Sequence, residues 1–145
     1  MQRSNMAAWG LIPTSPDEIS MYYSEHYCLP DNRLRRHTIR TDGFVSVNAE
    51  YPGGELVTKP LVFEGKELVI NYSTSAVGSV QVEIQDAGGA PSEGFGLAQC
   101  PEIFGDEIEH VVAWNGGSEV SKLAGQPVRL RFRMTDADLY SIRFR

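Results

Sequence analysis

The chain has 145 residues, 41% of them hydrophobic and 22% charged, which suits one globular domain whose core needs no metal or disulfide to hold it together. Its net charge of -6 argues against a general attraction to nucleic acid. No apolar run is long enough to cross a membrane, and the start, MQRSNMAAWG, lacks the apolar stretch of a signal peptide, so we expect a cytoplasmic chain unless a longer parent protein is exported.

Residues 1–27 differ in character from the rest of the chain. Small and polar residues precede Trp9, and a proline-containing loop then leads into an aromatic-rich strand expected from Ile19 to Tyr27. We expect this segment to be an N-terminal arm or edge strand, or the remnant of a preceding domain. Residues 28–145 are then expected to form a β-sandwich domain.

Apolar and polar residues alternate through most of the remaining chain, which is typical of strands with one buried and one solvated face. The expected strands cover residues 34–41, 44–49, 55–58, 68–73, 80–85, 109–114, 128–134 and 139–144. Residues 95–100 and 118–124 predict single helical turns. Many short, half-solvated strands predict an all-β fold, a two-sheet antiparallel β-sandwich of the jelly-roll type.

Two turns carry specific expectations. Asp42-Gly43 lies between two expected strands and is a strong hairpin signal. Thr135 to Asp138 interrupts the alternation of VRLRFRMTDADLYSIRFR, residues 128–145, and predicts the turn of a closing hairpin.

Arginines dominate the basic residues and gather in residues 33–40 and 129–145. Arg129, Arg131 and Arg133 share one face of a strand, which is either a solvated face with cross-strand ion pairs or a site for an anionic ligand such as a uronic acid or sulfated glycan. Nucleic acid is disfavoured because no aromatic residues are interleaved for stacking. Like charges directly opposite are unfavourable, so acids are expected across from the arginines. The candidates are Glu67, Glu83 and Glu109.

Aromatic side chains supply the candidate carbohydrate-binding residues, because rings stack on the apolar faces of sugars while polar neighbours bond the hydroxyls. These candidates are Trp9, Tyr22, Tyr23, Trp114 and Asn115. Tyr22 and Tyr23 are adjacent and therefore face opposite sides of their strand. The alternative for each ring is core packing with its polar tip at the rim.

Asp136 and Asp138 alternate within the expected C-terminal turn and could present oxygens to a structural Ca²⁺, although the spaced pattern of an EF-hand is absent and turn chemistry alone explains both. No other cofactor is expected. Cys28 and Cys100 are too few for a disulfide framework, so they are either free, buried residues or one long-range disulfide. Glu25 and His26 point to opposite faces, and no G-x-S-x-G motif occurs, so an enzyme is not expected.

Several stretches together resemble the C-terminal region of large bacterial glycoside-hydrolase-like proteins. They are GLIPTSPDEISMYYSEHY (10–27), LRRHTIRTDGFVSV (34–47), TKPLVFEGKELVINYSTSAVGSVQVEIQDAGG (58–89) and FGDEIEHVVAWNGGSEVSKLAGQPVRLRFRMTDADLYSIRF (104–144). The front part of such proteins looks like the five-bladed propeller of sucrose- and arabinan-cleaving glycosidases, and a β-sandwich follows it. The resemblance implies that the catalytic carboxylates lie in the propeller, that residues 10–27 are the junction, and that no catalytic residue carries over to this chain.

Three functions follow from these observations. The first is a non-catalytic accessory module that binds a polysaccharide or oligosaccharide. The second is a structural domain that self-associates, as a homodimer for example, through its N-terminal strand. The third is a small glycan hydrolase. Neither nucleic acid nor a membrane is an expected partner.

Overall fold

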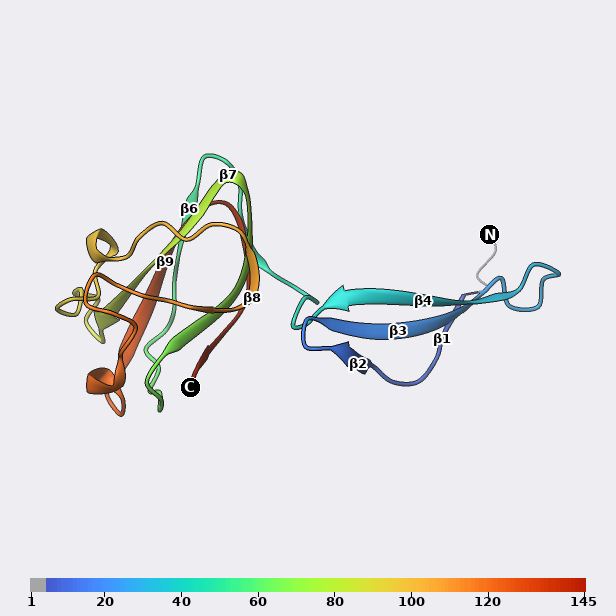
Figure 1. Ribbon diagram of the computed structural model, residues 1–145, viewed down its shortest axis with the longest axis horizontal. Coiled ribbons are helices and arrows are strands. Elements are labelled where there is room, and N and C mark those ends of the chain that lie inside the picture. The colour runs from blue at the N-terminus through green and yellow to red at the C-terminus, as the bar shows by residue number, and fades with distance from the viewer. Residues whose placement is uncertain (1–4) are drawn as a thin grey trace. The chain divides into compact units, whose positions relative to one another are not determined.

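The computed structural model describes residues 5–145, and the chain divides between Phe44 and Val45 into two compact units (Figure 1). Each unit contains one antiparallel sheet, and two short 3-10 helices are the helical segments of the described residues. The expected all-β class with two antiparallel sheets is confirmed, whereas the jelly-roll type stays a prediction. The boundary drawn at residues 27 and 28 falls inside the first unit. No helix within residues 5–145 is long and apolar enough to cross a membrane.

The first unit is a sheet built around one central strand. Its strands are β1 (Met6–Ala7), β2 (Ile12–Ser15), β3 (Glu18–Glu25) and β4 (Arg33–Arg40). β3 pairs with β4 along one side and with β2 and β1 along the other. The hairpin expected at Asp42-Gly43 is wrong, because β4 pairs back to β3 and the next strand belongs to the other sheet.

The sheet of the first unit has no apolar core of its own. Within residues 5–44 only two side chains are buried, and both are polar: Ser20 and Glu25. Large apolar side chains are exposed instead, namely Met6, Trp9, Leu11, Ile12, Tyr27, Leu34 and Phe44. A sheet normally becomes stable by burying one face against another element. The faces of this sheet bury little apolar surface within their own unit.

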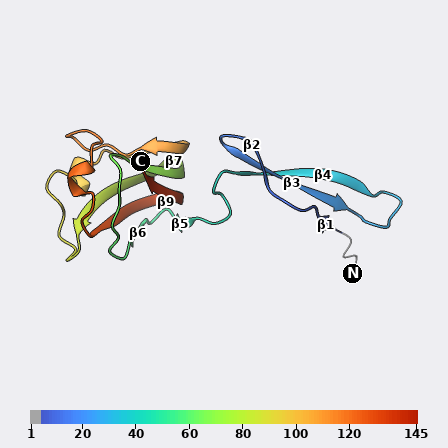
Figure 2. The same cartoon turned by 90° about the horizontal axis from the view of Figure 1, so that it is seen from below.

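The second unit is a five-stranded sheet in which β9 and β7 run side by side for most of their length (Figures 1 and 2). Its strands are β5 (Val47–Ala49), β6 (Gly54–Val57), β7 (Leu68–Asp86), β8 (Asp106–Val111) and β9 (Val128–Phe144). β8 borders β7, while β5 and β6 both pair with β9. The 3-10 helices η1 (Leu97–Gln99) and η2 (Ser121–Leu123) lie within the two stretches expected to form helical turns.

The C-terminal stretch forms one strand rather than the expected hairpin. β9 continues through Thr135 to Asp138, so the turn expected there is wrong. The chain accommodates these residues as a bulge: residues 75–78 of β7 stand opposite Asp136 alone, and Asp136 adopts a φ of 43°. Aspartate tolerates this left-handed backbone in a bulge as well as in a turn, and bulges bend strands. Figure 1 shows β7 bending sharply there.

The two arms of the bent sheet share one apolar core. Leu68, Ile70 and Tyr72 come from one arm of β7, and Val82 and Ile84 come from the other. Connecting segments complete the cluster with Phe63, Phe95, Cys100, Ile103, Val112, Trp114 and Val120. The second unit therefore has the closed interior that the first unit lacks.

Candidate functional site

The arginine row of β9, defined as Arg129, Arg131 and Arg133, is bonded within the second unit. The acceptors are the carbonyl oxygen of Ala87 for Arg129 (3.1 Å), Glu55 and Glu83 for Arg131 (2.7 and 3.3 Å), and the side chain of Gln81 for Arg133. The arrangement favours the solvated face with cross-strand partners over an anionic-ligand site.

The three acids expected opposite the arginines all pair with an arginine. Glu83 lies directly across from Arg131 in the register of β7 and β9. Glu109 pairs with Arg143, and Glu67 pairs with Arg145 at 3.2 Å. The expectation that these acids face the arginine row is therefore confirmed for Glu83 and wrong for Glu67 and Glu109, because Arg129 and Arg133 stand opposite Gln85 and Gln81.

Glu83 is the most buried member of this set, with its side chain 5% exposed. Burial acts to raise the pKa of Glu83, but hydrogen bonds from the side chain of Gln85 (2.8 Å), the backbone N–H of Leu97 (3.1 Å) and the guanidinium of Arg131 outweigh it and hold that pKa below its ordinary value. Glu83 is consequently a structural anion that joins β7, β9 and the start of η1.

Asp136 and Asp138, the candidate calcium ligands, lie at the bulge of β9. Asp138 accepts hydrogen bonds at Oδ1 from Ser46 Oγ (2.6 Å) and Asn48 Nδ2 (3.1 Å), so this carboxylate ties β9 to the start of β5. Within residues 5–145 no group of three or more His, Cys, Asp or Glu side chains is placed to hold a metal ion. Asp138 thus has a structural role in the second unit, and a Ca²⁺ site at this pair stays a prediction.

Trp114 is a core residue, with a relative exposure of 3%. Its Nε1 donates to the carbonyl oxygen of Val82 at 2.9 Å, and its ring meets that of Phe95 edge-on. Trp114 and Gly117 close a tight turn, and Asn115 is exposed at its tip. Of the two interpretations offered for Trp114, the structure places it in the core, so it does not form a surface with Asn115 on which a sugar could stack.

The two cysteines are free thiols in different units. Cys28 is exposed in the segment after β3, where it adopts a φ of 67°, and Cys100 is buried in the core of the second unit. Burial raises the pKa of the Cys100 thiol. The expectation of two buried residues holds for Cys100 and is wrong for Cys28.

The remaining aromatic candidates are Trp9, in the segment between β1 and β2, and Tyr22 and Tyr23, on the neighbouring strand β3. A hollow of about 180 Å³ lies there, lined by Ala7, Ala8, Gly10, Leu11, Met21, Tyr22 and Tyr23. Trp9, between two of these lining residues in the sequence, is fully exposed at 103%. Tyr22 and Tyr23 are both half-buried and lie opposite Arg36 and Arg35, so they face opposite sides of the sheet as expected.

One face of the first sheet carries a basic cluster around a buried carboxylate. The side chain of Glu25 is 11% exposed and lies 2.8 Å from Nε of Arg33, 3.2 Å from Nε of Arg35 and 3.7 Å from Nε2 of His37. The hydrogen bond from Arg33 holds the pKa of Glu25 below its ordinary value, with the charges of Arg35 and Arg33 adding to it. A carboxylate with a lowered pKa is a poor proton donor near neutral pH.

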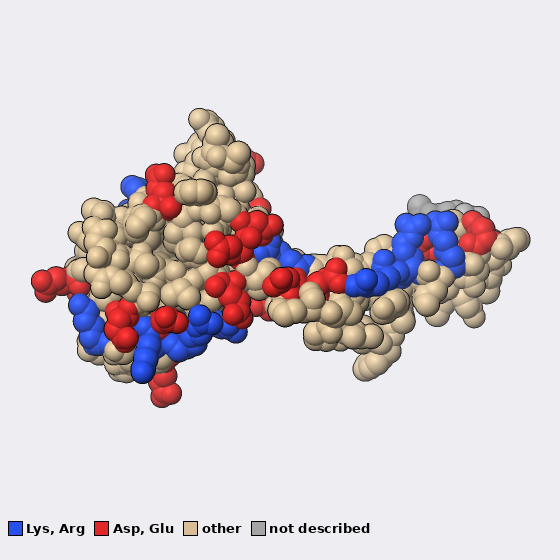
Figure 3. All heavy atoms as spheres, in the orientation of Figure 1, with Lys and Arg blue, Asp and Glu red and all other residues tan. Residues whose placement is uncertain are grey.

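The opposite face carries a second polar cluster. Arg36 donates through Nε to Ser20 Oγ at 2.8 Å and pairs with Glu18, and Thr14 bonds Ser20 at 2.8 Å. Figure 3 shows basic atoms gathered along this sheet. Neither cluster was foreseen, because the register that joins β3 to β4 cannot be read from alternation alone; the alternating Arg33, Arg35 and His37 were the available signal.

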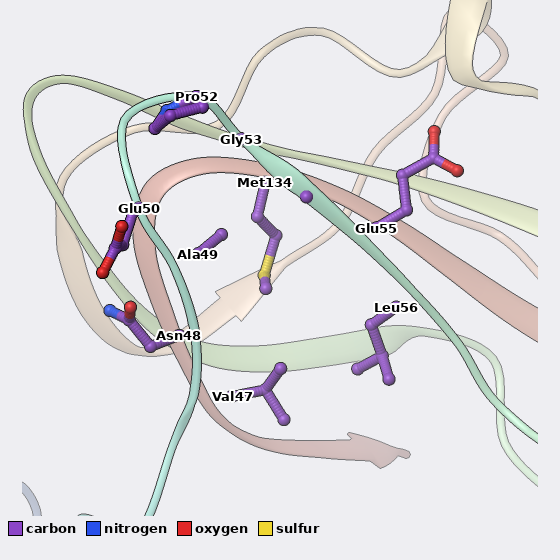
Figure 4. A pocket seen from close by; sticks show the side chains of 10 residues that line it. Val47, Asn48, Ala49, Glu50, Pro52, Gly53, Glu55, Leu56 and Met134 are labelled. Atoms are coloured by element: carbon purple, nitrogen blue, oxygen red, sulfur yellow. The ribbon is translucent and has the colours of Figure 1, made fainter.

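A hollow of the second unit lies between β5 and β6. Its volume is about 330 Å³, and its lining residues are Val47, Asn48, Ala49, Glu50, Pro52, Gly53, Gly54, Glu55, Leu56 and Met134. Figure 4 shows Val47 and Met134 pointing toward one another, while the carboxylates of Glu50 and Glu55 point away. The hollow therefore offers an apolar lining with no charged group aimed into it.

His26 and His110 each lie beside one acid. His26 bonds Asp31 in the loop between β3 and β4, and His110 lies 3.2 Å from Glu107. The bond from His26 lowers the pKa of Asp31. Burial, together with Glu107, raises the pKa of Tyr72 to about 12. These pairs fix loops and strand edges. None of them lines the hollow that includes Tyr22 and Tyr23 or the hollow between β5 and β6.

No protein-family model, no curated protein and no solved structure matches the chain.

Proposed function

We propose that the chain is a non-catalytic accessory region that serves assembly, and that its first unit is a docking sheet completed by contact with another protein chain. The resemblance to glycoside-hydrolase-like proteins suggests that the parent is a carbohydrate-processing protein. In such a parent this region would hold parts together rather than carry out the reaction.

One observation carries the proposal. Residues 5–44 bury Ser20 and Glu25 alone, while Trp9, Leu34 and other large apolar side chains are exposed. Fully burying each large apolar side chain contributes roughly 1.5–3 kcal/mol, and an isolated small sheet is marginal in water. Contact with a partner would supply the burial that this sheet lacks within its own unit.

Limited digestion with trypsin tests the proposal, because arginines occur in β4 and in β9. In dilute solution, where light scattering shows single chains, we expect cleavage after Arg35 and Arg36 to be at least about tenfold faster than after Arg131 and Arg133, since cleavage follows the free energy of local opening. Fragment masses assign the sites.

Arg131 and Arg133 are matched controls, because they too lie within a strand of a sheet. If β4 of single chains resists trypsin as long as β9 does, the first sheet is stable alone and the proposal fails. Slower cleavage of β4 once the chain is bound to a partner would support docking directly.

Carbohydrate binding is the second candidate function, and the hollow lined in part by Tyr22 and Tyr23 favours it. A fully exposed Trp9 next to a hollow lined in part by Tyr22 and Tyr23 is an arrangement on which a sugar ring could stack. The site would lie in the first unit, away from Trp114.

Affinity electrophoresis in gels containing neutral or acidic polysaccharides tests this candidate. We expect a retarded chain, and loss of the retardation in Trp9→Ala without any change in circular dichroism. Tyr51→Ala is the control, because Tyr51 is also exposed but lies in the second unit. Unretarded migration in every polysaccharide at high protein concentration would remove the candidate.

A further inference from the structure

Two strands at the edges of the two sheets carry opposite charge. β4 reads RLRRHTIR and is exposed over its first six residues, while β8 reads DEIEHV and exposes its three acids. Among the described strands, β4 pairs with β3 alone and β8 pairs with β7 alone. Edge strands can accept a further strand through main-chain hydrogen bonds.

The two sequences match when they are aligned antiparallel. Leu34 then faces Ile108, and the arginines on either side of it face acids. The charged pairs are Arg33 with Glu109, Arg35 with Glu107, and Arg36 with Asp106. Opposite charges directly across a strand pair are favourable, and like charges are not. The register of β8 against β7 shifts at Ile108 and Glu109, so this bulge lies within the four matched positions, and Asp106 and Glu107 are the two that precede it.

The same rule disfavours the pairing of either strand with the same strand of a second copy. Two β4 strands would bring arginines against arginines, and two β8 strands would bring acids against acids. Charged residues on an edge normally prevent pairing, but that protection fails where the two edges of one chain carry opposite signs.

We propose, on the basis of the proposed assembly function, that the partner of the docking sheet is a second copy of this chain, whose β8 accepts β4 as an added antiparallel strand. The contact joins different surfaces of the two copies, so it closes into a ring or continues as a chain of copies.

The present neighbours of Arg33, Arg35 and Glu109 allow an added contact. Arg33 and Arg35 contact Glu25 through Nε, and a guanidinium carries further donors on its two terminal nitrogens. Glu109 already accepts from Arg143 and lies near Arg145, but its side chain is 54% exposed. The added arginines would extend an existing network of ion pairs.

A charge-swap experiment tests the proposal on the full chain. At low salt we expect the wild-type chain to show, by sedimentation velocity, a mass above the 16.1 kDa of one chain that grows with concentration. Raising the salt to about 1 M, where the Debye length is about 3 Å, should return the mass toward one chain. Arg35→Glu/Arg36→Glu and Glu107→Lys/Glu109→Lys should each remain single chains. A mixture of the two variants should associate again in pairs, because the unaltered β4 of the lysine variant then faces the unaltered β8 of the arginine variant.

Lys59→Glu/Lys66→Glu is the control, because it changes the net charge as much as the arginine variant does but alters neither edge strand; it should associate like the wild type. Arg33 stays in the arginine variant to keep its bond to Glu25, and circular dichroism checks that each variant is folded. If the arginine variant fails to fold, the Glu107→Lys/Glu109→Lys chain alone decides between loss and retention of association.

A wild-type chain that stays single at every concentration, a lysine variant that still associates, or a mixture that stays unassociated would each overturn the inference. The trypsin experiment is independent of these outcomes. Rapid cleavage of β4 combined with a single-chain wild type would retain the docking sheet and reject the second copy as its partner.

Discussion

Glu83 shows how a single charged residue is accommodated inside the second unit. Its nearly buried carboxylate accepts hydrogen bonds from Gln85, Leu97 and Arg131, which lie on β7, in η1 and on β9. An isolated buried charge would be costly, whereas one with several donors is stable in its ionised form. The lowered pKa of Glu83 therefore links the stability of the second unit to pH.

The direction of this linkage follows from the lowered pKa. Glu83 contributes its full stabilisation above its ordinary pKa of 4.5, and the contribution is lost as the pH falls through the lower pKa of the folded chain. We expect Glu83→Gln to lower the free energy of unfolding by about 2 kcal/mol near neutral pH. Below that folded-state pKa the variant and the wild type should converge, since both side chains are then neutral.

Urea denaturation followed by the fluorescence of buried Trp114 across this pH range measures the difference. Glu64→Gln is a control, because Glu64 is an exposed acid of the same unit. A Glu83→Gln variant whose stability runs parallel to that of the wild type at every pH would show that Glu83 has no part in the acid sensitivity.

At the scale of elements, the bend in β7 and β9 determines the shape of the second unit. Gly78 is buried where the two strands bulge, and a Cβ atom added there would lie 2.7 Å from the carbonyl oxygen of Thr135 and closer still to that of Asp136. Only a residue without a side chain lets the backbones approach so closely. The bend therefore depends on this glycine and on the left-handed backbone of Asp136.

We expect Gly78→Ala to destabilise the second unit by about 1–3 kcal/mol, because the methyl group would force the two strands apart at the bend. Gly116→Ala is the matched control, since a Cβ there meets nothing within 4 Å, and its effect should stay within about 0.5 kcal/mol. Urea denaturation of both variants gives the comparison. Equal stability of Gly78→Ala and the wild type would mean that the bend does not need the close approach.

The sequence predicted strands better than it predicted how they pair. Alternation located β7 and β9 and the pairing of Glu83 with an arginine, because burial on one face imposes a period of two residues. The bulge at Asp136 was mistaken for a turn, because aspartate with a positive φ suits both structures. Trp114 could not be assigned to core or rim, since that depends on the segment around Phe95 folding over it. The cluster at Glu25 depends on the length of the loop between β3 and β4, which alternation does not constrain.

At the scale of the whole molecule, the two units differ in how they are stabilised. The second unit encloses an apolar core between the arms of a bent sheet. In the first unit, ion pairs and hydrogen bonds around Glu25 and Ser20 connect the strands of the sheet. Ion pairs that are half exposed contribute little to stability. We therefore propose, as the central claim, that the first unit gains its stability from a partner.

Hydrogen exchange of backbone amides tests that claim most directly, because it reports the opening free energy of each strand separately. In a solution of single chains, we expect the amides shared by β3 and β4 to exchange nearly as fast as in an unfolded peptide. The amides of Val82, Ile84, Leu130 and Phe132 should exchange only through global unfolding. Equal protection of β3 and β9 in single chains would contradict the claim, because the first sheet would then be stable without a partner.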